Sequence, residues 1–319
     1  MEKNIVIGVD LGGTRIKLGA VNEKGNIIKD LNIASEAELG PEAVIKNIIK
    51  GAKELINCGL FPKESVRGVG IGAPGSVDID GSTVKYPPNF PNWGVVHLGE
   101  EVSKGLDKIL VAVDNDANAA AAGESKFGAG KEYSNFLLLT LGTGVGGGII
   151  IDNKVFRGVT GAGAELGHVS IDYKGVPCKC GNIGCIEAYV GQKYFSQRTI
   201  EQLKDYPNSK IIELVNGDLS KIEPYIIYKA AQSGDEFAIK ALAEYGFYLG
   251  VAIASFINIF DFELVIVGGG ISAAGDFIFE PMRKIAKERV LSVHKNKFKI
   301  VPAQLGNHAG ILGAAALVP

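Results

Sequence analysis

The 319-residue chain lacks several features that mark particular classes of protein. It has four cysteines, too few for a disulfide scaffold at this length. It has no run of the roughly 20 apolar residues that a bilayer span needs. The longest apolar run, 245–260, is bracketed by Glu244 and Asp261 and predicts a buried helix. A formal net charge of −2 argues against a surface that coats a polyanion, so no nucleic-acid partner is expected.

The N-terminal residues show no signal-peptide pattern, because an apolar run begins at once after residues 2–4. We therefore expect a cytoplasmic protein with reduced thiols and no membrane partner. Hydrophobic residues at 46% and charged residues at 21% are typical of a soluble globular chain, which disfavours disorder and coiled coil. Domains usually span about 100–200 residues, so this length favours two.

Glycine is the abundant residue, with 43 copies gathered in clusters rather than at a fixed period. Three clusters follow predicted strands over 4–9, 136–141 and 264–267. After the first two strands the same order recurs: a Gly/Thr turn, a strand, a polar turn and another strand. The recurrence predicts an internal duplication of an α/β half. Three unrelated turns in an ordinary α/β protein are the alternative.

The glycine turns are suited to phosphate binding. Asp10-Leu-Gly-Gly-Thr14 offers backbone N–H groups at close range, and Asp10 is a candidate ligand of Mg²⁺ or its waters. Thr143 and Gly144 form a second such turn, and Gly268–Gly270 would suit an adenosine or ribose. No Walker loop is present, and the second turn precedes a strand rather than the helix of a Rossmann fingerprint. The alternative for any one of these glycine turns is a purely structural role, with no bound phosphate.

A cysteine cluster predicts a metal site. His168, Cys178, Cys180 and Cys185 supply three thiolates and one imidazole within eighteen residues, a complete tetrahedral set for Zn²⁺. Because protein would fill all four positions, the site would be structural; a reduced loop without metal is the alternative. Glu165 and Glu187 flank the cluster, where they could be aimed at sugar hydroxyls or be solvated surface charges.

The stretch Asn115-Asp116-Ala-Asn118 follows a predicted strand, 109–113, and opens an alanine-rich helix. Ligands of α/β proteins bind at the carboxyl ends of strands, so Asp116 is a candidate general base. The alternative is that Asp116 caps the helix.

Together these motifs resemble the ROK family of sugar kinases and repressors, within the actin-like ATPase superfamily. The motifs are Asp10-Leu-Gly-Gly-Thr14, Asn115-Asp116-Ala-Asn118, Leu141-Gly-Thr-Gly-Val-Gly-Gly147, Gly161-Ala-Gly-Ala-Glu-Leu-Gly-His168 and Cys178-x-Cys-Gly-x-x-Gly-Cys-x-Glu187. The resemblance implies an α/β fold of two actin-like (ribonuclease H-like) domains around an interdomain cleft, with a structural zinc loop. The implied domains are 1–115 plus about 303–319, and 116–302, with a C-terminal helix returning to the first domain.

The resemblance also implies an ATP-dependent hexose kinase, most similar to a bacterial-type glucokinase, with Asp116 as the base for the sugar 6-hydroxyl. Sugar contacts would come from Asn89, Asn115, Asp116, Glu165, His168 and Glu187. MgATP would be held by Asp10, Gly12, Gly13, Thr14, Lys17, Thr143, Gly144 and Gly269. The implied cofactors are ATP, Mg²⁺ and structural Zn²⁺, and the implied assembly is a homodimer or higher homo-oligomer.

The sequence leaves open both the preferred sugar and a role without catalysis. Kinases for N-acetylmannosamine, mannose, fructose and allose share these motifs, and Asn92, which stands where the family pattern usually has glycine, could alter sugar preference. A non-catalytic sugar sensor would be expected to lose Asp116 or the Asp10 turn. Family repressors carry an N-terminal DNA-binding extension; we expect none here, because the phosphate motif begins at residue 10.

Overall fold

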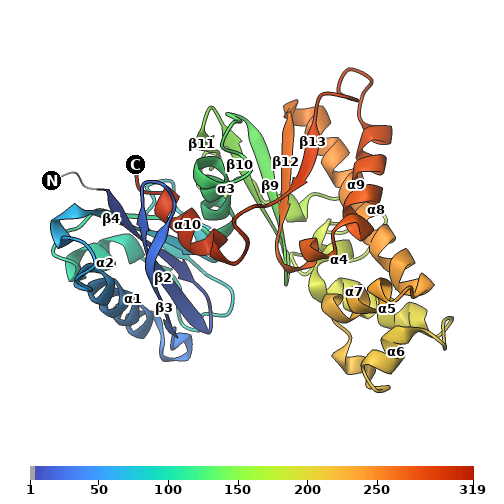
Figure 1. Ribbon diagram of the computed structural model, residues 1–319, viewed down its shortest axis with the longest axis horizontal. Coiled ribbons are helices and arrows are strands. Elements are labelled where there is room, and N and C mark those ends of the chain that lie inside the picture. Colours follow the sequence, from blue (N-terminus) through green and yellow to red (C-terminus); the bar gives the residue numbers. More distant parts are fainter. Residues whose placement is uncertain (1–3) are drawn as a thin grey trace. The chain divides into compact units, whose positions relative to one another are not determined.

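The computed structural model describes residues 4–319 (Figure 1). Its internal contacts divide the chain into two compact units. The first unit holds the residues through Asn135, together with Gly148–Ala164 and Ala303–Pro319. The second holds Phe136–Gly147 and Glu165–Pro302. The domain boundaries implied by the family resemblance, 1–115 with about 303–319 and 116–302, stay a prediction.

The first unit is built on a five-stranded sheet of order β3-β2-β1-β4-β8. The strands β1, β2 and β3 are antiparallel neighbours, and β4 and β8 run parallel to β1. A small three-stranded sheet of order β5-β6-β7 follows β4 in the chain. The strand bounds are β1 Ile5–Leu11, β2 Arg15–Asn22, β3 Ile27–Ala34, β4 Val66–Ala73, β5 Ser76–Val77, β6 Val84–Lys85, β7 Val95–Val96 and β8 Val111–Asn115.

Helices cover both faces of this sheet, which is why β1 and β4 are buried almost throughout. The helices are α1 Pro41–Ile56, α2 Leu98–Gly105, α3 Asp116–Phe127 and α10 Ala309–Ala316. The C-terminal α10 packs on β1, β4 and α3, as the family resemblance implied. Glycine permits this close approach, because a Cβ on Gly70 would lie 1.8 Å from the Ala314 carbonyl oxygen.

A buried carboxylate fixes the return of the chain to this unit. Glu124, near the end of α3, is 1% exposed. Its two oxygens accept the backbone N–H groups of Ala129 at 2.7 Å, Gln304 at 2.9 Å and Leu305 at 3.0 Å. The segment that leads into α10 is therefore held against α3 by charge-assisted hydrogen bonds.

The second sheet has the order β11-β10-β9-β12-β13, which repeats the order of the first. Its strands are β9 Phe136–Leu141, β10 Val145–Ile151, β11 Lys154–Val155, β12 Leu264–Gly268 and β13 Lys299–Pro302. The strand β12 is parallel to both β9 and β13, as β4 is to β1 and β8. The shared topology confirms the duplication that the recurring motif predicted.

The longest helix, α8 Glu236–Phe260, forms the core of the second unit beside α9 Asp276–Arg289 (Figure 1). Among residues 4–319 it alone is long and apolar enough to cross a membrane, yet 56% of its most apolar window is buried in protein. A Cβ on Gly246 would lie 2.4 Å from the Ile278 carbonyl oxygen, so the two helix backbones approach closely. The prediction of a buried helix is confirmed. Shorter helices complete the unit: α4 Glu187–Val190, α5 Gln192–Leu203, α6 Lys210–Leu214 and α7 Pro224–Gln232.

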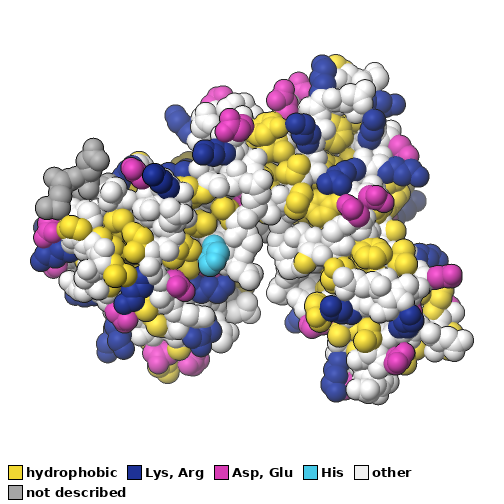
Figure 2. Space-filling model, viewed as in Figure 1, with side chains coloured by type: hydrophobic (Ala, Val, Ile, Leu, Met, Phe, Trp, Pro, Cys, Tyr) yellow, Lys and Arg dark blue, Asp and Glu magenta, His cyan; other side chains and the backbone are white. Residues whose placement is uncertain are grey.

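Charged side chains of both signs are interspersed over the face of the molecule shown in Figure 2. No large field of one sign dominates that face, as the near-zero net charge leads one to expect.

Candidate functional site

In the first unit, strand register brings two of the predicted motifs to one edge of the sheet. Asp10 on β1 pairs with Gly72 on β4, and Gly72 pairs with Asp114 on β8. Since β1, β4 and β8 are parallel, the Asp10 turn and the Asn115-Asp116 stretch both lie at the carboxyl ends of adjacent strands.

Asp10 lies in a cationic and partly buried setting. Its Oδ2 is 3.7 Å from Lys17 Nζ, and a Cβ on Gly310 would lie 2.4 Å from the same oxygen. The carboxylate therefore faces the first turn of α10. Burial raises the pKa of Asp10, while Lys17 pulls it back down. A carboxylate that loses water on burial is a suitable ligand for a divalent cation, which would favour its ionised form.

Hydrogen bonds within the first unit hold the turn after Asp10 in place. The Gly12 N–H donates to the Arg15 carbonyl at 3.0 Å, and Ser35 Oγ donates to the Gly13 carbonyl at 2.6 Å. A Cβ on Gly13 would lie 3.2 Å from Cβ of Asn89, so the predicted sugar residue Asn89 sits beside the turn. Asn89 has a left-handed backbone with φ 65°, a conformation that asparagine tolerates.

The helix-cap interpretation of Asp116 is wrong. The cap of α3 is Asn115, whose side-chain oxygen accepts the N–H groups of Ala117 at 2.9 Å and Asn118 at 3.4 Å. The Asn115 amide nitrogen donates to the Gly75 carbonyl at 3.0 Å. Asp116 is the first helical residue, and its Oδ1 accepts the Ala117 N–H at 2.8 Å. The capping role thus falls to Asn115, and Asp116 stays a candidate base.

Beside Asp116 lies an ion pair that the sequence did not reveal. The Asp114 carboxylate, 2% exposed, accepts Arg157 Nε at 2.7 Å and Arg157 Nη2 at 2.6 Å. It also accepts Asn118 Nδ2 at 2.9 Å and the Asn115 N–H at 2.8 Å. Four donors on one buried carboxylate hold the start of α3 in place. The two partners are 43 residues apart and no local pattern links them.

In the second unit, the four predicted zinc ligands come together. Their ligand atoms all lie within 4.8 Å of one another. His168 Nδ1 is 3.8 Å from Cys178 Sγ, and Cys180 Sγ is 3.6 Å from Cys185 Sγ. This donor set and spacing fit a tetrahedral Zn²⁺, and Nε2 of His168 would stay available for a hydroxyl. Burial raises the pKa of Cys185 to about 12, and a bound cation would favour the thiolate form of this residue.

The two glutamates that flank the cluster have different surroundings. Glu165 is exposed, as a solvated charge would be. Glu187 is half-buried at the start of α4, and its Oε2 accepts the Val145 N–H at 3.0 Å. Glu187 therefore contacts the second glycine turn directly, a link that the sequence did not indicate.

The second and third glycine turns lie side by side. Thr140 at the end of β9 pairs with Gly268 at the end of β12. Gly269 has φ 93°, and a Cβ on it would lie 2.0 Å from the Leu141 carbonyl oxygen. The predicted phosphate turn, 142–144, and the predicted nucleoside turn, 268–270, are thus adjacent.

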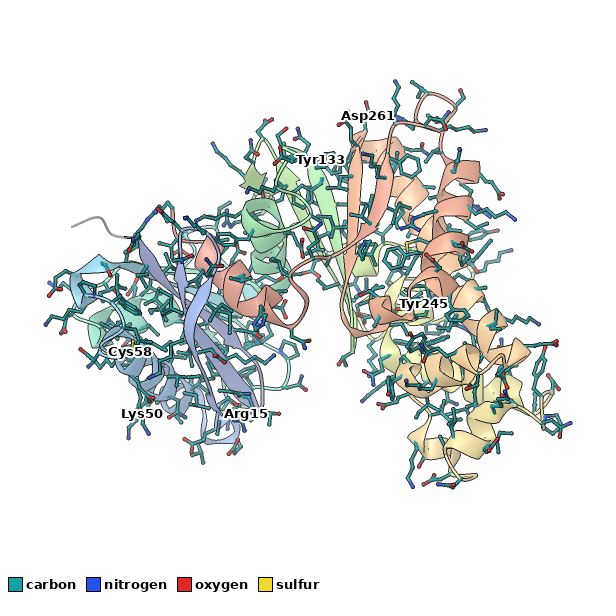
Figure 3. All side chains as sticks on the ribbon, viewed as in Figure 1. Arg15, Lys50, Cys58, Tyr133, Tyr245 and Asp261 are labelled. Carbon is teal, nitrogen blue, oxygen red and sulfur yellow. The ribbon has the colours of Figure 1, made fainter. Side chains whose placement is uncertain are left out.

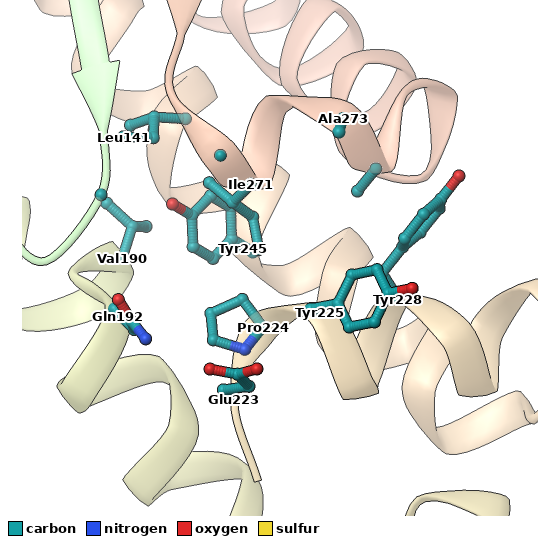
Figure 4. A pocket seen from close by; sticks show the side chains of 13 residues that line it. Leu141, Val190, Gln192, Glu223, Pro224, Tyr225, Tyr228, Tyr245, Ile271 and Ala273 are labelled. Carbon is teal, nitrogen blue, oxygen red and sulfur yellow. The ribbon is translucent and has the colours of Figure 1, made fainter. Parts of the chain in front are cut away.

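A pocket of about 330 Å³ opens beside these two turns (Figure 4). Tyr245, on α8 in the second unit (Figure 3), lines it and is fully buried. Gln192 and Glu223 add an amide and a carboxylate to a lining that includes three tyrosines. The lining is Leu141, Gly142, Val190, Gln192, Glu223, Pro224, Tyr225, Tyr228, Tyr245, Gly270, Ile271, Ala273 and Ala274. Sequence reasoning found its glycines but missed its wall from α5, α7 and α8, which carries no motif.

The predicted site residues divide between the two units. The first unit holds Asp10, Gly12, Gly13, Thr14, Lys17, Asn89, Asn115 and Asp116. The second holds Thr143, Gly144, Glu165, His168, Cys178, Cys180, Cys185, Glu187 and Gly269.

A family profile, curated relatives and solved structures all relate this chain to one protein family. A sequence profile of the ROK family matches residues 6–319. A glucokinase of Thermotoga maritima is 38% identical over 318 residues, 100% of this chain and 98% of that protein. A ROK family glucokinase from Streptomyces griseus, solved in complex with glucose and AMPPNP, has a TM-score of 0.82 and 36% identity, with 98% and 99% of the chains covered. A xylose repressor of Caldicellulosiruptor bescii is 31% identical over 313 residues, 98% of this chain and 77% of that protein.

The fold and the site define a duplicated α/β protein with glycine turns at the carboxyl ends of its strands and a Cys₃His cluster. The chain belongs to the ROK family, because the family profile and the relatives both cover nearly all of it.

Proposed function

We propose that this protein is an ATP-dependent hexose kinase that transfers the γ-phosphoryl group of MgATP to the 6-hydroxyl of glucose. The observation that carries the proposal is the pair of adjacent glycine turns opening on an apolar pocket, in a chain 36% identical to a glucokinase solved with glucose and AMPPNP. Phosphoryl transfer needs positioning and charge stabilisation more than covalent chemistry.

The pocket of the second unit supports a nucleoside rather than a bare polyphosphate. Its walls are mainly aromatic and aliphatic, which suits the faces of a purine ring. Gln192 and Glu223 would serve the polar edge of the base or the ribose hydroxyls. Thr143 and Gly144 would then meet the phosphates, and Gly269 would let the ribose approach the backbone.

The first unit supplies the remaining groups for phosphoryl transfer. Asp10 would hold Mg²⁺ or its waters, and Lys17 would neutralise phosphate charge. The Gly13 N–H and the Thr14 hydroxyl would donate to phosphate oxygens. The Gly12 N–H is used within the turn, where it donates to the Arg15 carbonyl, and Gly12 would instead let a phosphate approach the backbone.

Asp116 would accept the proton of the sugar 6-hydroxyl as the phosphoryl group arrives. Asn89, Glu165, His168 and Glu187 would hold the sugar. Asn115 could offer the sugar only the second N–H of its side-chain amide, because its oxygen caps α3 and its nitrogen already donates to the Gly75 carbonyl.

Zinc is the metal that the Cys₃His donor set fits. With four protein ligands it would supply rigidity and no activated water. His168, Cys178, Cys180 and Cys185 would hold it, and so fix the direction of Glu187, which follows Cys185 by two residues. Reduced thiols fit a cytoplasmic location, and the family resemblance favours a homodimer, which light scattering of the purified protein would check.

A sugar-sensing role without catalysis is the second candidate, since xylose repressors are similar over 98% of this chain. The kinase proposal is favoured because Asp116 and the Asp10 turn are both present at one edge of the first sheet.

A coupled assay of ADP formation with a panel of hexoses, and with ATP or polyphosphate as donor, separates these functions. We expect turnover that depends on sugar and MgATP, with glucose ranked first. Asp116→Asn should lower kcat by about 10²–10⁴-fold with little change in sugar affinity. Asp107→Asn, at an exposed site of the same unit, is the matched control. No sugar-dependent turnover, or phosphate transfer to 6-deoxyglucose, would contradict the proposal.

A further inference from the structure

The peptide groups of Val145 are held from two directions by segments that carry zinc ligands. The Val145 N–H donates to Glu187 Oε2 at 3.0 Å. On its other side, a Cβ on Gly167 would lie 2.0 Å from the Val145 carbonyl oxygen, so the Gly167 backbone lies directly against it. Gly167 immediately precedes His168, and Glu187 follows Cys185 by two residues.

Val145 begins β10 directly after the Thr143-Gly144 turn, so what fixes Val145 also fixes the turn. A Cβ on Gly144 would lie 2.3 Å from Glu187 Oε2, which shows how closely the carboxylate approaches the turn. The Gly142 carbonyl accepts the Gln192 N–H at 3.1 Å, a second link from the chain that follows Glu187.

From these contacts we propose that Glu187 is a positioning residue for the Thr143-Gly144 turn, through which the zinc loop sets the affinity for nucleotide independently of sugar. This rests on the proposed function, in which that turn meets the phosphates. A carboxylate that accepts a backbone N–H orients the peptide strongly, because the bond is charge-assisted. The bond also occupies one oxygen of Glu187 that would otherwise face the phosphates as unpaired negative charge.

Backbone hydrogen bonds connect the residues around Glu187 to the segments that carry the zinc ligands. The Ala188 N–H donates to the Cys185 carbonyl at 2.9 Å, and the Ile186 N–H donates to the Val169 carbonyl at 3.0 Å. These bonds tie Glu187 to the ligand segments on either side of it. A metal bound to Cys185 and His168 would stiffen these segments, so we expect its removal to loosen the hold of Glu187 on the turn.

The first test is calorimetric titration of AMPPNP and Mg²⁺ in the absence of sugar. Glu187→Ala removes the acceptor of a buried N–H, and we expect the nucleotide to bind on the order of tenfold more weakly. Glu187→Gln keeps a side-chain oxygen that can accept the Val145 N–H, so it should retain most of the affinity. Glu213→Ala is the control, because Glu213 is exposed on α6 of the same unit, away from the turn, and its loss should leave nucleotide affinity unchanged.

The second test needs no nucleotide. Hydrogen exchange measured by mass spectrometry should speed up across 142–148 in Glu187→Ala and in chelator-treated wild type, while the α8 and β12 peptides of the same unit keep their protection. That protection shows that the variant is folded.

The outcomes separate the two proposals. If wild type does not bind AMPPNP, the proposed function fails and this inference fails with it. If wild type binds but Glu187→Ala binds equally well, or exchange in 142–148 is unchanged, the positioning role of Glu187 is wrong and the kinase proposal stands.

Discussion

Replacing Arg157 by methionine would test whether the Asp114–Arg157 pair holds the candidate base in place. The substitution keeps much of the side-chain length and removes both charged hydrogen bonds to Asp114. The Asp114 carboxylate would remain buried, with only the Asn118 amide and the Asn115 N–H as donors. The start of α3, which carries Asp116, would lose its main anchor.

Breaking a buried ion pair by removing one partner costs about 3–5 kcal/mol. Here the cost should be smaller, because the Arg157 side chain is 33% exposed and two donors remain on Asp114. We expect a loss of about 2–3 kcal/mol in the free energy of unfolding, after allowing for solvent screening. For a unit of this size that corresponds to a fall in Tm of roughly 5–10 °C.

A double-mutant cycle with Asp114→Asn gives the decisive measurement, by thermal and urea unfolding. Asparagine carries no charge, so losing Arg157 should matter less in that background, with a coupling of about 0.5–3 kcal/mol. The Arg157→Met enzyme should also have a lower kcat, with the KM for ATP unchanged. Arg67→Met, an exposed arginine on β4, is the control and should change stability by no more than about 0.5 kcal/mol.

Strict additivity in the cycle would refute the reasoning, because it would mean that Asp114 and Arg157 do not stabilise each other. A destabilised variant with wild-type kcat would show instead that the pair serves the fold and leaves Asp116 unaffected.

Two further predictions concern the metal cluster and Asp10. Purified protein should contain about one Zn²⁺ per chain, and Cys180→Ser should lose it and lower Tm; Cys180 is exposed, so lost packing cannot explain that result, and a metal-free, fully active wild type would contradict it. Burial raises the pKa of Asp10 above its usual 3.8, so the folded state binds the carboxyl proton more tightly than the unfolded state does. Folding stability therefore falls as the pH rises through the raised pKa and Asp10 ionises. Asp10→Asn should therefore raise Tm at pH 7 in Mg²⁺-free buffer, an advantage that shrinks on acidification, while impairing Mg²⁺-dependent nucleotide use; a lower Tm at pH 7 would count against the assignment.

Local patterns in the sequence determined the strands, the glycine turns and the cysteine cluster. The apolar runs before residues 10, 142 and 268 predicted β1, β9 and β12, because a strand buried on both faces needs continuous apolar residues. The zinc ligands lie within eighteen residues, so one short segment of the chain is enough to bring them together. The recurring turn pattern likewise predicted a duplication, which the matching strand orders confirmed.

Tertiary structure decided which of several equivalent residues takes each role. Asn115 and Asp116 are both residue types that cap helices well. Asn115 is the cap in the structure, and its side chain also donates a hydrogen bond to the Gly75 carbonyl, 40 residues away in the sequence. The pairing of Asp114 with Arg157, the contact of Glu187 with Val145, and the pocket wall from α5, α7 and α8 join distant parts of the chain. Such contacts depend on how the elements pack, which local periodicity and turn chemistry do not specify.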